Sequence, residues 1–174
     1  MNQLQREAVE ITKELGDIVF VGAVAVNSHL GWRHRTTRDF DIAMATTLTR
    51  EQLKEELKKK GYRTFEERGK EVIYSPRNAK VDIYTKDVSD IPIDKIYSTA
   101  KEVLLGNHKI QVASPEVMLV AKLRAMRPSR PQDKDDFTRL CIEHGKSIDW
   151  NVVEDMATQM EVSTIKESIR ALSG

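Results

Sequence analysis

The sequence has little cysteine, no long apolar run and almost no net charge. Cys141 is the only cysteine of the 174 residues, so no disulfide can form within the chain and no second cysteine can complete a zinc site. We expect Cys141 to be a small buried residue of a helix. No apolar run approaches the ~18 residues of a membrane span. Charged residues spread through the N-terminal segment exclude a secretory hydrophobic region, so the expected location is cytoplasmic, without a membrane partner.

Charges of the two signs nearly cancel. The chain has 28 Lys and Arg residues against 27 Asp and Glu residues, which leaves a formal net charge of +1. A chain this neutral does not indicate bulk binding to nucleic acid, so any such contact must come from a local patch. With 40% hydrophobic and 32% charged residues, the composition is typical of a folded globular protein of one domain, or of one domain with a small appendage. Internal repeats and low-complexity segments are absent from the sequence.

Apolar periodicity and turn residues predict an α-β-α-β-α order, followed by strands and then helices. The predicted strands are 18–21, 39–45, 62–65, 71–74, 80–84, 101–105 and 109–112. From residue 114 onward the pattern becomes helical, with helices around 117–126, 137–144, 152–160 and 163–172. We therefore predict an α/β (α+β) fold, with a mixed sheet and flanking helices in a core of residues 1–113 and a helical C-terminal subdomain of residues 114–174.

Three aspartates occupy alternating strand positions. Asp39 and Asp41 are two residues apart on a predicted strand, so both side chains leave the same face, and Asp82 alternates with apolar neighbours on a later strand. If these strands are neighbours, the three carboxylates converge. Like charges ~4 Å apart repel by about 4 kcal/mol at an effective dielectric of 20, so such a cluster needs a proton or a cation.

The ligand chemistry of these aspartates favours Mg²⁺ or Mn²⁺, because the set contains hard oxygen donors and no histidine or cysteine. Two such ions can clamp the attacking and leaving oxygens of an in-line phosphoryl displacement. The alternative is an ordinary amphipathic strand, whose wet face shows the same Asp-x-Asp pattern.

A glycine turn precedes the first two aspartates. Gly22 lies where a short apolar strand is followed by a predicted helix, and backbone N–H groups at such a helix start bind phosphate. A tight turn without a ligand is the alternative interpretation of an isolated strand-Gly-helix pattern.

These features together resemble a known family. Residues 20–31, with R-x-T-x-D-x-D at residues 35–41, resemble the opening of small nucleotidyltransferase-fold proteins of the DNA polymerase beta-like superfamily. In that superfamily the two strand aspartates bind metal and a third carboxylate follows on a later strand, a position that Asp82 fits. The resemblance therefore implies a nucleotidyltransferase-type sheet, in which Asp39, Asp41 and Asp82 are the catalytic and metal-binding residues.

The second half of the chain resembles the AbiEii-like toxin branch. It contains I-x-V-A-S-P-E at residues 110–116, K-L-x-A at 122–125, and D-x-x-D at 133–136, in the order of that branch. The resemblance covers roughly residues 17–142. The nucleotide-binding residues that it implies are Gly22, Ala23, Arg35, Thr37 and Lys122.

One position departs from the pattern of the family. The second residue of the glycine turn is Ala23, where the family has Gly or Ser, so no hydroxyl is offered to a phosphate, although the backbone N–H remains. The resemblance implies a Mg²⁺-dependent enzyme that moves a nucleoside monophosphate from a nucleoside triphosphate to a hydroxyl of an RNA end or a protein, in a toxin-antitoxin setting. The alternative is a degenerate domain that binds a nucleotide, a protein or an RNA.

Overall fold

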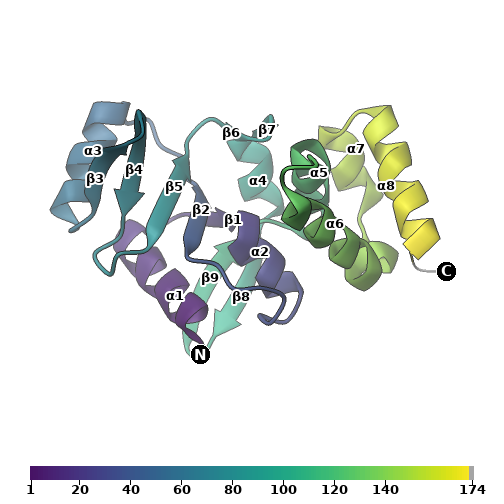
Figure 1. Cartoon of the computed structure of the whole chain (residues 1–174), viewed down its shortest axis with the longest axis horizontal. Helices are drawn as coiled ribbons and strands as arrows, with labels where there is room; N and C mark the ends of the chain where they lie inside the picture. The colour runs from purple at the N-terminus through teal and green to yellow at the C-terminus, as the bar shows by residue number, and fades with distance from the viewer. Residues whose placement is uncertain (173–174) are drawn as a thin grey trace.

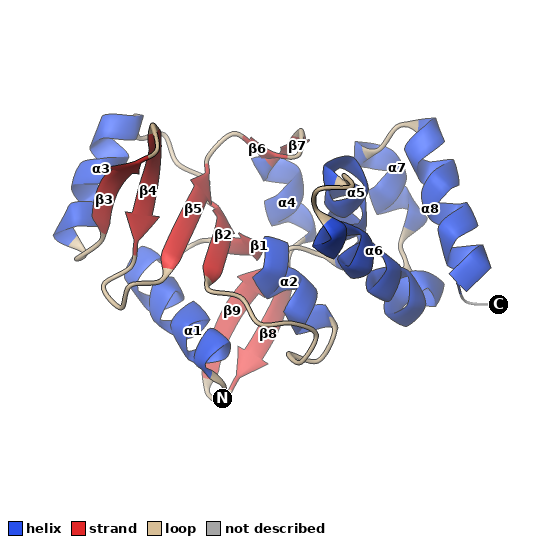
Figure 2. Cartoon of the chain, in the orientation of Figure 1, coloured by secondary structure: helices blue, strands red, loops and turns tan. Residues whose placement is uncertain are grey.

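The computed structural model describes residues 1–172, which form one mixed seven-stranded sheet, a separate two-stranded ribbon and eight α-helices (Figure 1, Figure 2). The strands are β1 (Val19–Val21), β2 (Asp39–Ala43), β3 (Arg63–Glu67), β4 (Lys70–Tyr74), β5 (Lys80–Tyr84), β6 (Asp87–Val88), β7 (Ile91–Pro92), β8 (Lys101–Leu105) and β9 (His108–Val112). The helices are α1 (Gln3–Leu15), α2 (Gly22–His29), α3 (Arg50–Lys59), α4 (Ile93–Thr99), α5 (Pro115–Ala125), α6 (Pro131–His144), α7 (Trp150–Met156) and α8 (Gln159–Leu172). The predicted α/β class with a mixed sheet is confirmed.

The strand order of the large sheet is β3-β4-β5-β2-β1-β9-β8, and β6 pairs only with β7. Strand β2 is antiparallel to β1 and parallel to β5, while β9 is parallel to β1 and antiparallel to β8. The chain leaves β2, forms α3, β3 and β4, and returns as β5. Strands β2 and β5 are therefore neighbours inside the sheet, and their first residues, Asp39 and Lys80, lie side by side.

Short polar signals in the sequence set the starts of several helices. The side chain of Asn2 accepts a hydrogen bond from the backbone of Gln5 at the start of α1, and Ser114 caps α5 in the same way. Thr49 forms a capping box at the start of α3, since its hydroxyl accepts from the N–H of Gln52 at 3.2 Å and its own N–H donates to the side chain of Gln52 at 2.9 Å. These caps satisfy N–H groups that a helix leaves without partners.

Helices α5 to α8 gather beside the sheet, on the side of α2 (Figure 1). The ring Nε2 of His29, at the end of α2, lies 2.7 Å from the carbonyl oxygen of Ala113, and the ring Nε2 of His144 lies 2.7 Å from the carbonyl oxygen of His29. These contacts connect α2 to both ends of the α5–α6 segment. The division into residues 1–113 and 114–174 stays a prediction, and its last two residues lie outside the described residues.

Two parts of the fold differ from the pattern expected from the sequence. The sequence pattern predicts no element between 85 and 100, where the ribbon β6–β7 and helix α4 form and bury Ile91, Ile93 and Ile96. The predicted helices 152–160 and 163–172 are wrong in their boundaries. The chain breaks at Thr158, whose hydroxyl and N–H form a capping box with Glu161, so α8 starts earlier and has 14 residues. Among the helices within residues 1–172, none is both long and apolar enough to cross a membrane.

Candidate active site

Two of the three aspartates face each other across neighbouring strands. The parallel pairing of β2 with β5 places Asp41 directly opposite Asp82, and Asp39 leaves the same face of β2 two residues earlier. Asp41 and Asp82 are partly buried, whereas Asp39 is exposed at the start of its strand. Strands β2 and β5 are therefore neighbours, which is the condition that the predicted convergence of the carboxylates requires. The oxygens of all three carboxylates do not lie within 4.8 Å of one another, so a shared cation would have to draw them closer.

Burial and like charge act together on Asp41. Burial raises the pKa of its carboxyl, and the neighbouring Asp82 and Asp39 raise it further against the attraction of Lys122 and Arg130, to about 6. An ordinary aspartate has a pKa near 4. The face of β2 and β5 therefore carries more negative charge than its surroundings compensate, which is the condition in which a divalent cation binds favourably.

Tyr84 is a member of this face that the sequence motifs do not include. It lies two residues after Asp82 on β5, so its side chain leaves the sheet on the same side. Burial, the charges of Asp41 and Asp82, and a hydrogen bond to Asp41 raise the pKa of its hydroxyl to about 12. The hydroxyl thus keeps its proton at neutral pH. The alternation Asp-x-Tyr in the sequence contains the signal that places it here.

Gly22 brings the start of α2 against the carboxylate of Asp41. Its φ of +58° lies in the region that favours glycine, and a Cβ added to it would lie 2.2 Å from Oδ2 of Asp41. The residue before it, Val21, provides no side-chain cap to α2. The start of this eight-residue helix therefore lies beside Asp41, and its N–H groups and dipole favour an anion such as phosphate.

Ala23 follows Gly22 in the first turn, and its methyl group is 6% exposed. Its carbonyl oxygen accepts a hydrogen bond of 2.9 Å from the side-chain amide of Asn27, which is fully buried. The oxygen of the same amide accepts from the backbone N–H of Arg35 at 3.3 Å. Asn27 thus connects the glycine turn to the loop that leads into β2.

The two basic residues predicted to bind nucleotide, Arg35 and Lys122, meet at Asp136 of α6. The guanidinium of Arg35 donates to both carboxylate oxygens, at 3.2 and 3.0 Å, and Nζ of Lys122 lies 2.7 Å from Oδ2. Lys122 also donates to Asp133 at 2.8 Å. The side chain of Lys122 is 8% exposed, so the ion pairs are largely shielded from water.

Asp133 and Asp136, the D-x-x-D pair of the resemblance, have a competing interpretation as ordinary acids of a helix first turn, yet both are completely buried. His34 lies 2.8 Å from Asp136, and Arg130 lies 2.8 Å from Asp133. Burial acts to raise the pKa of Asp136, but hydrogen bonds from Arg35 and Lys122 outweigh it and lower that pKa below its usual range. The sequence shows the Asp-x-x-Asp spacing, but it does not show which basic side chains form ion pairs with these two aspartates.

Thr37, the remaining predicted nucleotide-binding residue, shapes the entry into β2. Its hydroxyl accepts a hydrogen bond from the N–H of Asp39 at 3.2 Å. This contact fixes the backbone turn immediately before the first carboxylate. The structure therefore places Gly22, Ala23 and Thr37 around the two ends of the acidic face.

One compact group of potential metal ligands lies outside the aspartate face. Within residues 1–172, ligand atoms of His34, Asp135 and Asp136 lie within 4.8 Å of one another. Asp136 already forms ion pairs with Arg35 and Lys122, so these two positive charges would repel a divalent cation bound there. The aspartate face of β2 and β5, where the described residues form no ion pair with a carboxylate, suits such a cation better.

Solved structures show the same fold at low sequence identity. A nucleotidyltransferase-like antigenic protein from Paracoccidioides brasiliensis is 13% identical, with a TM-score of 0.62 over 95% of this chain and 93% of that one. The antibiotic-resistance factor ANT(2″)-Ia, in a solution structure, is 13% identical with a TM-score of 0.56, over 97% of this chain and 90% of that one. A crystal structure of ANT(2″)-Ia in complex with adenylyl-2″-tobramycin is 14% identical with a TM-score of 0.56, covering 97% of this chain and 99% of that one.

The family assignment comes from the sequence. No curated protein matches the chain. The model of the family described as "Nucleotidyl transferase AbiEii toxin, Type IV TA system" matches residues 10–141, which span the glycine turn, all three aspartates and the Asp133–Asp136 segment. This family and the nucleotidyltransferase-like fold support a nucleotidyl transfer function. The chain belongs to the AbiEii nucleotidyltransferase toxin family.

Proposed function

We propose that the chain transfers a nucleoside monophosphate from a nucleoside triphosphate to a hydroxyl of an RNA end or a protein, with release of pyrophosphate. The observation that carries this proposal is the in-register pair Asp41–Asp82 beside the glycine turn at Gly22. The turn offers backbone N–H groups to phosphate, and the strands offer carboxylates on the same side. The toxin-antitoxin system named for the family supports an acceptor that is a component of the cell, either an RNA or a protein.

The basic residues have a defined place in this proposal. Lys122 and Arg130 act on the charge of Asp41, so both lie near the face where a triphosphate would sit. Arg35 and Lys122 both form an ion pair with Asp136, which ties the loop before β2 to Lys122. A triphosphate would add negative charge between these cations and the glycine turn, where charge-assisted hydrogen bonds are strong.

The donor set of the face fits Mg²⁺ or Mn²⁺. Asp39, Asp41 and Asp82 provide only hard oxygen ligands, and the raised pKa of Asp41 indicates uncompensated negative charge. When bound, the cation supplies charge stabilisation to the transferring phosphoryl group. The chain's own contribution is to orient the three carboxylates through β2 and β5. In this proposal Asp82, opposite Asp41, accepts a proton from the acceptor hydroxyl.

A second function is favoured by a specific observation. Ala23 removes the hydroxyl that the family pattern offers to phosphate, and its methyl group is buried. A domain with this turn can retain nucleotide, protein or RNA binding without transfer. The two functions differ in whether labelled nucleotide becomes covalently attached to an acceptor.

Binding of a divalent cation to the aspartate face is expected to stabilise the fold. Mg²⁺ or Mn²⁺ at about 100 times its Kd should raise the free energy of unfolding by about 2.7 kcal/mol, because the cation binds only the folded chain. Thermal unfolding with and without the cation measures the effect. Asp82→Asn should remove most of it. Glu102→Gln, an exposed carboxyl on the edge strand β8, is the matched control and should leave it unchanged. Equal stabilisation of wild type and Asp82→Asn would contradict this metal site.

The proposed transfer reaction is tested with Ala23→Ser and all four labelled triphosphates, using RNA and protein fractions as acceptors. One hydrogen bond from a serine to a charged oxygen contributes roughly 1.5–3 kcal/mol, so Ala23→Ser is expected to speed transfer by about tenfold or more. Wild type should be slow but active. If both proteins are inert while another transferase labels the same acceptors, the binding function replaces the enzyme. A slower Ala23→Ser would show that the turn contacts phosphate through its backbone alone.

A further inference from the structure

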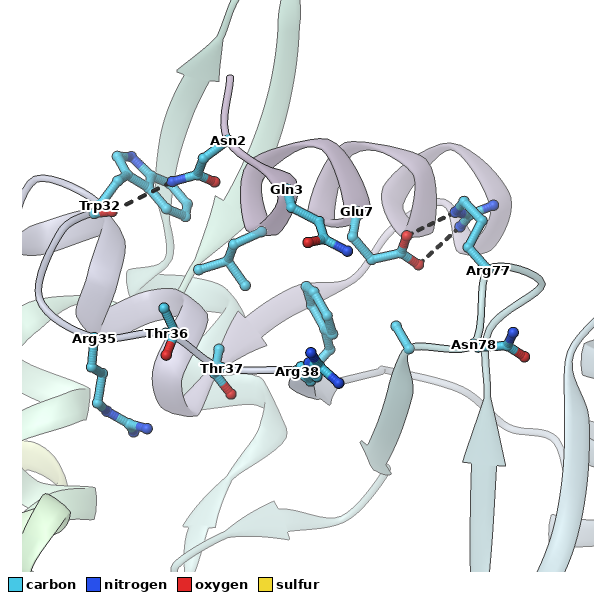
Figure 3. A pocket seen from close by; sticks show the side chains of 13 residues that line it. Asn2, Gln3, Glu7, Trp32, Arg35, Thr36, Thr37, Arg38, Arg77 and Asn78 are labelled. Carbon is cyan, nitrogen blue, oxygen red and sulfur yellow. Dashed lines mark hydrogen bonds and ion pairs between the residues drawn. The ribbon is translucent and has the colours of Figure 1, made fainter.

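An open pocket of about 840 Å³ lies between the start of α1, the loop 32–38 and the turn 77–79 (Figure 3). Its volume falls within the range of about 300–1,000 Å³ that is usual for small-molecule sites. Segments far apart in the sequence form its walls, and none of the three aspartates belongs to its lining. Of the residues predicted to bind nucleotide, only Arg35 and Thr37 line it, so the pocket adjoins the loop that leads into β2 but not the aspartate face.

The pocket opens on the opposite face of β2 from the carboxylates. Phe40 lines it, and strand alternation directs the side chains of Asp39 and Asp41 to the other face. Arg35 contributes to the wall while its guanidinium points away from α1, toward Asp136 (Figure 3). A ligand in this pocket would thus be separated by the sheet from a triphosphate at Gly22, while touching the same loop that leads into the aspartates.

Trp32 closes one end of the pocket in a strained backbone conformation. Its φ is +65°, which is unusual for a bulky residue and costs energy that the surroundings must supply. Its N–H donates to the carbonyl oxygen of Asn27 at 2.7 Å, and its carbonyl accepts from the side chain of Asn2 at 3.4 Å. The cap residue of α1 and a residue of α2 therefore fix the backbone of the half-buried Trp32 beside the pocket, and Leu4 adds an apolar residue to the lining.

Three polar side chains of the wall are free to bind a ligand. Among the described residues, the side chains of Gln3, Thr36 and Arg38 make no hydrogen bond or ion pair, and all three are exposed. Glu7, the one carboxylate of the lining, is already bound by Arg77 at 2.8 Å. The pocket thus combines an aromatic ring, an amide, a hydroxyl and an unpaired guanidinium.

We propose that this pocket binds an unstacked nucleobase with its attached phosphate. The face of the base stacks on Trp32, as bases of single-stranded nucleic acids do on aromatic side chains. The amide of Gln3 pairs with an edge of the base, for which a donor beside an acceptor is suited. Arg38 binds the phosphate. The base can come from a nucleotide at an unpaired RNA end or from a free nucleotide, and both present the same chemistry.

The sequence provides a selective probe, because Trp32 and Trp150 are the only two tryptophans. In Trp150→Phe the fluorescence reports on Trp32 alone. We expect saturable quenching when nucleoside monophosphates or a short single-stranded RNA are added in EDTA, without triphosphate. Trp32→Phe retains only Trp150, on α7, and should show no quenching. Quenching by RNA alone identifies the RNA end as the source, and equal quenching by monophosphates identifies a free nucleotide.

Substitutions separate this pocket from the candidate active site. Affinity for fluorescein-labelled RNA or nucleotide, measured by anisotropy, should fall about tenfold or more in Trp32→Leu and Arg38→Gln. Trp32→Phe should retain most of it. Arg139→Gln, an exposed arginine of α6, is the matched control for charge and should bind as wild type does. Asp41→Asn should bind normally, because its carboxylate is on the other face.

Three outcomes would overturn the proposal. They are the absence of quenching at Trp32, an equal loss in Arg38→Gln and Arg139→Gln, and quenching by an unrelated acidic peptide as strong as that by RNA. The third would assign the pocket to a protein partner. The proposal does not depend on transfer activity, so an inert enzyme that still shows quenching contradicts only the proposed function. An active enzyme without quenching contradicts only this pocket assignment.

Discussion

Asp41→Asn is expected to abolish nucleotidyl transfer and to make the protein more stable at neutral pH. Asp41 is the carboxylate that lies both opposite Asp82 and against Gly22, so its loss removes the centre of the proposed site. We expect the rate to fall by about a thousandfold or more, the scale of losing a group that acts on transition-state charge. Asparagine has nearly the same shape, so the change tests charge and not packing.

The gain in stability follows from the raised pKa of Asp41. The folded state binds the proton of this carboxyl more tightly than the unfolded chain, whose pKa is near 3.8. The stability of the wild type should therefore fall as the pH rises from about 4 through about 6, by up to about 3 kcal/mol for a shift of this size. Above pH 6 the full cost of the buried charge is present. The asparagine of the variant carries no charge at any pH and avoids this cost.

Urea unfolding of both proteins at pH 4 and pH 8, in EDTA, measures this effect. The variant should be close to the wild type at pH 4 and more stable at pH 8, while transfer is tested in parallel with Mg²⁺. If the difference in free energy of unfolding between the two proteins were the same at pH 4 and at pH 8, the charged form of Asp41 would not be destabilised by its surroundings. Retained activity in the variant would remove Asp41 from the site.

Asp136→Ala is expected to destabilise the protein by about 3–5 kcal/mol, the cost of leaving one partner of a buried ion pair without its counter-charge. Asp136 is fully buried and is contacted by His34, Arg35 and Lys122. Without it, the buried ammonium of Lys122 retains only Asp133, and the guanidinium of Arg35 loses both of its hydrogen bonds. Chemical denaturation at pH 7 gives the free energy of unfolding.

The neighbouring Asp135 provides a matched control. Its side chain is 64% exposed and lies 3.4 Å from His34, so Asp135→Ala should cost less than about 1 kcal/mol. The lowered pKa of Asp136 adds a pH dependence. The stability that this carboxylate contributes is present above a pH of about 4 and is lost as the pH falls through its lower folded pKa. Similar losses in the two variants would mean that the network around Asp136 contributes little.

The sequence predicts the sheet and its acidic face because both depend on local patterns. Alternation assigns Asp39 and Asp41 to one face and Asp82 to a second strand, and neighbouring strands then bring them together. The glycine turn is visible for the same reason. Capping residues such as Thr49 and Ser114 locate helix starts, because they satisfy local N–H groups.

Features that depend on long-range packing are not visible in the sequence. Asp136 looks like an ordinary first-turn acid, and only the folding of the loop carrying His34 and Arg35 against α6 makes it a buried counter-charge. Helix α4 is missed because its seven residues provide too few turns for a periodic signal. The pocket at Trp32 arises from three separate segments, and no sequence pattern connects them.

Because β2 pairs with β5, the acidic face depends on two strands that are far apart in the chain. Asp41 and Asp82 meet only after the chain has formed α3, β3 and β4 and returned, and β5 borders β4 on its other side. A slip of one residue in this register would turn Asp82 to the opposite face. The three strands β3, β4 and β5 lie at one edge of the sheet, so their local opening separates the carboxylates while the core around β1 and β9 stays folded. We therefore expect heat to separate the carboxylates of the proposed site before the fold as a whole is lost.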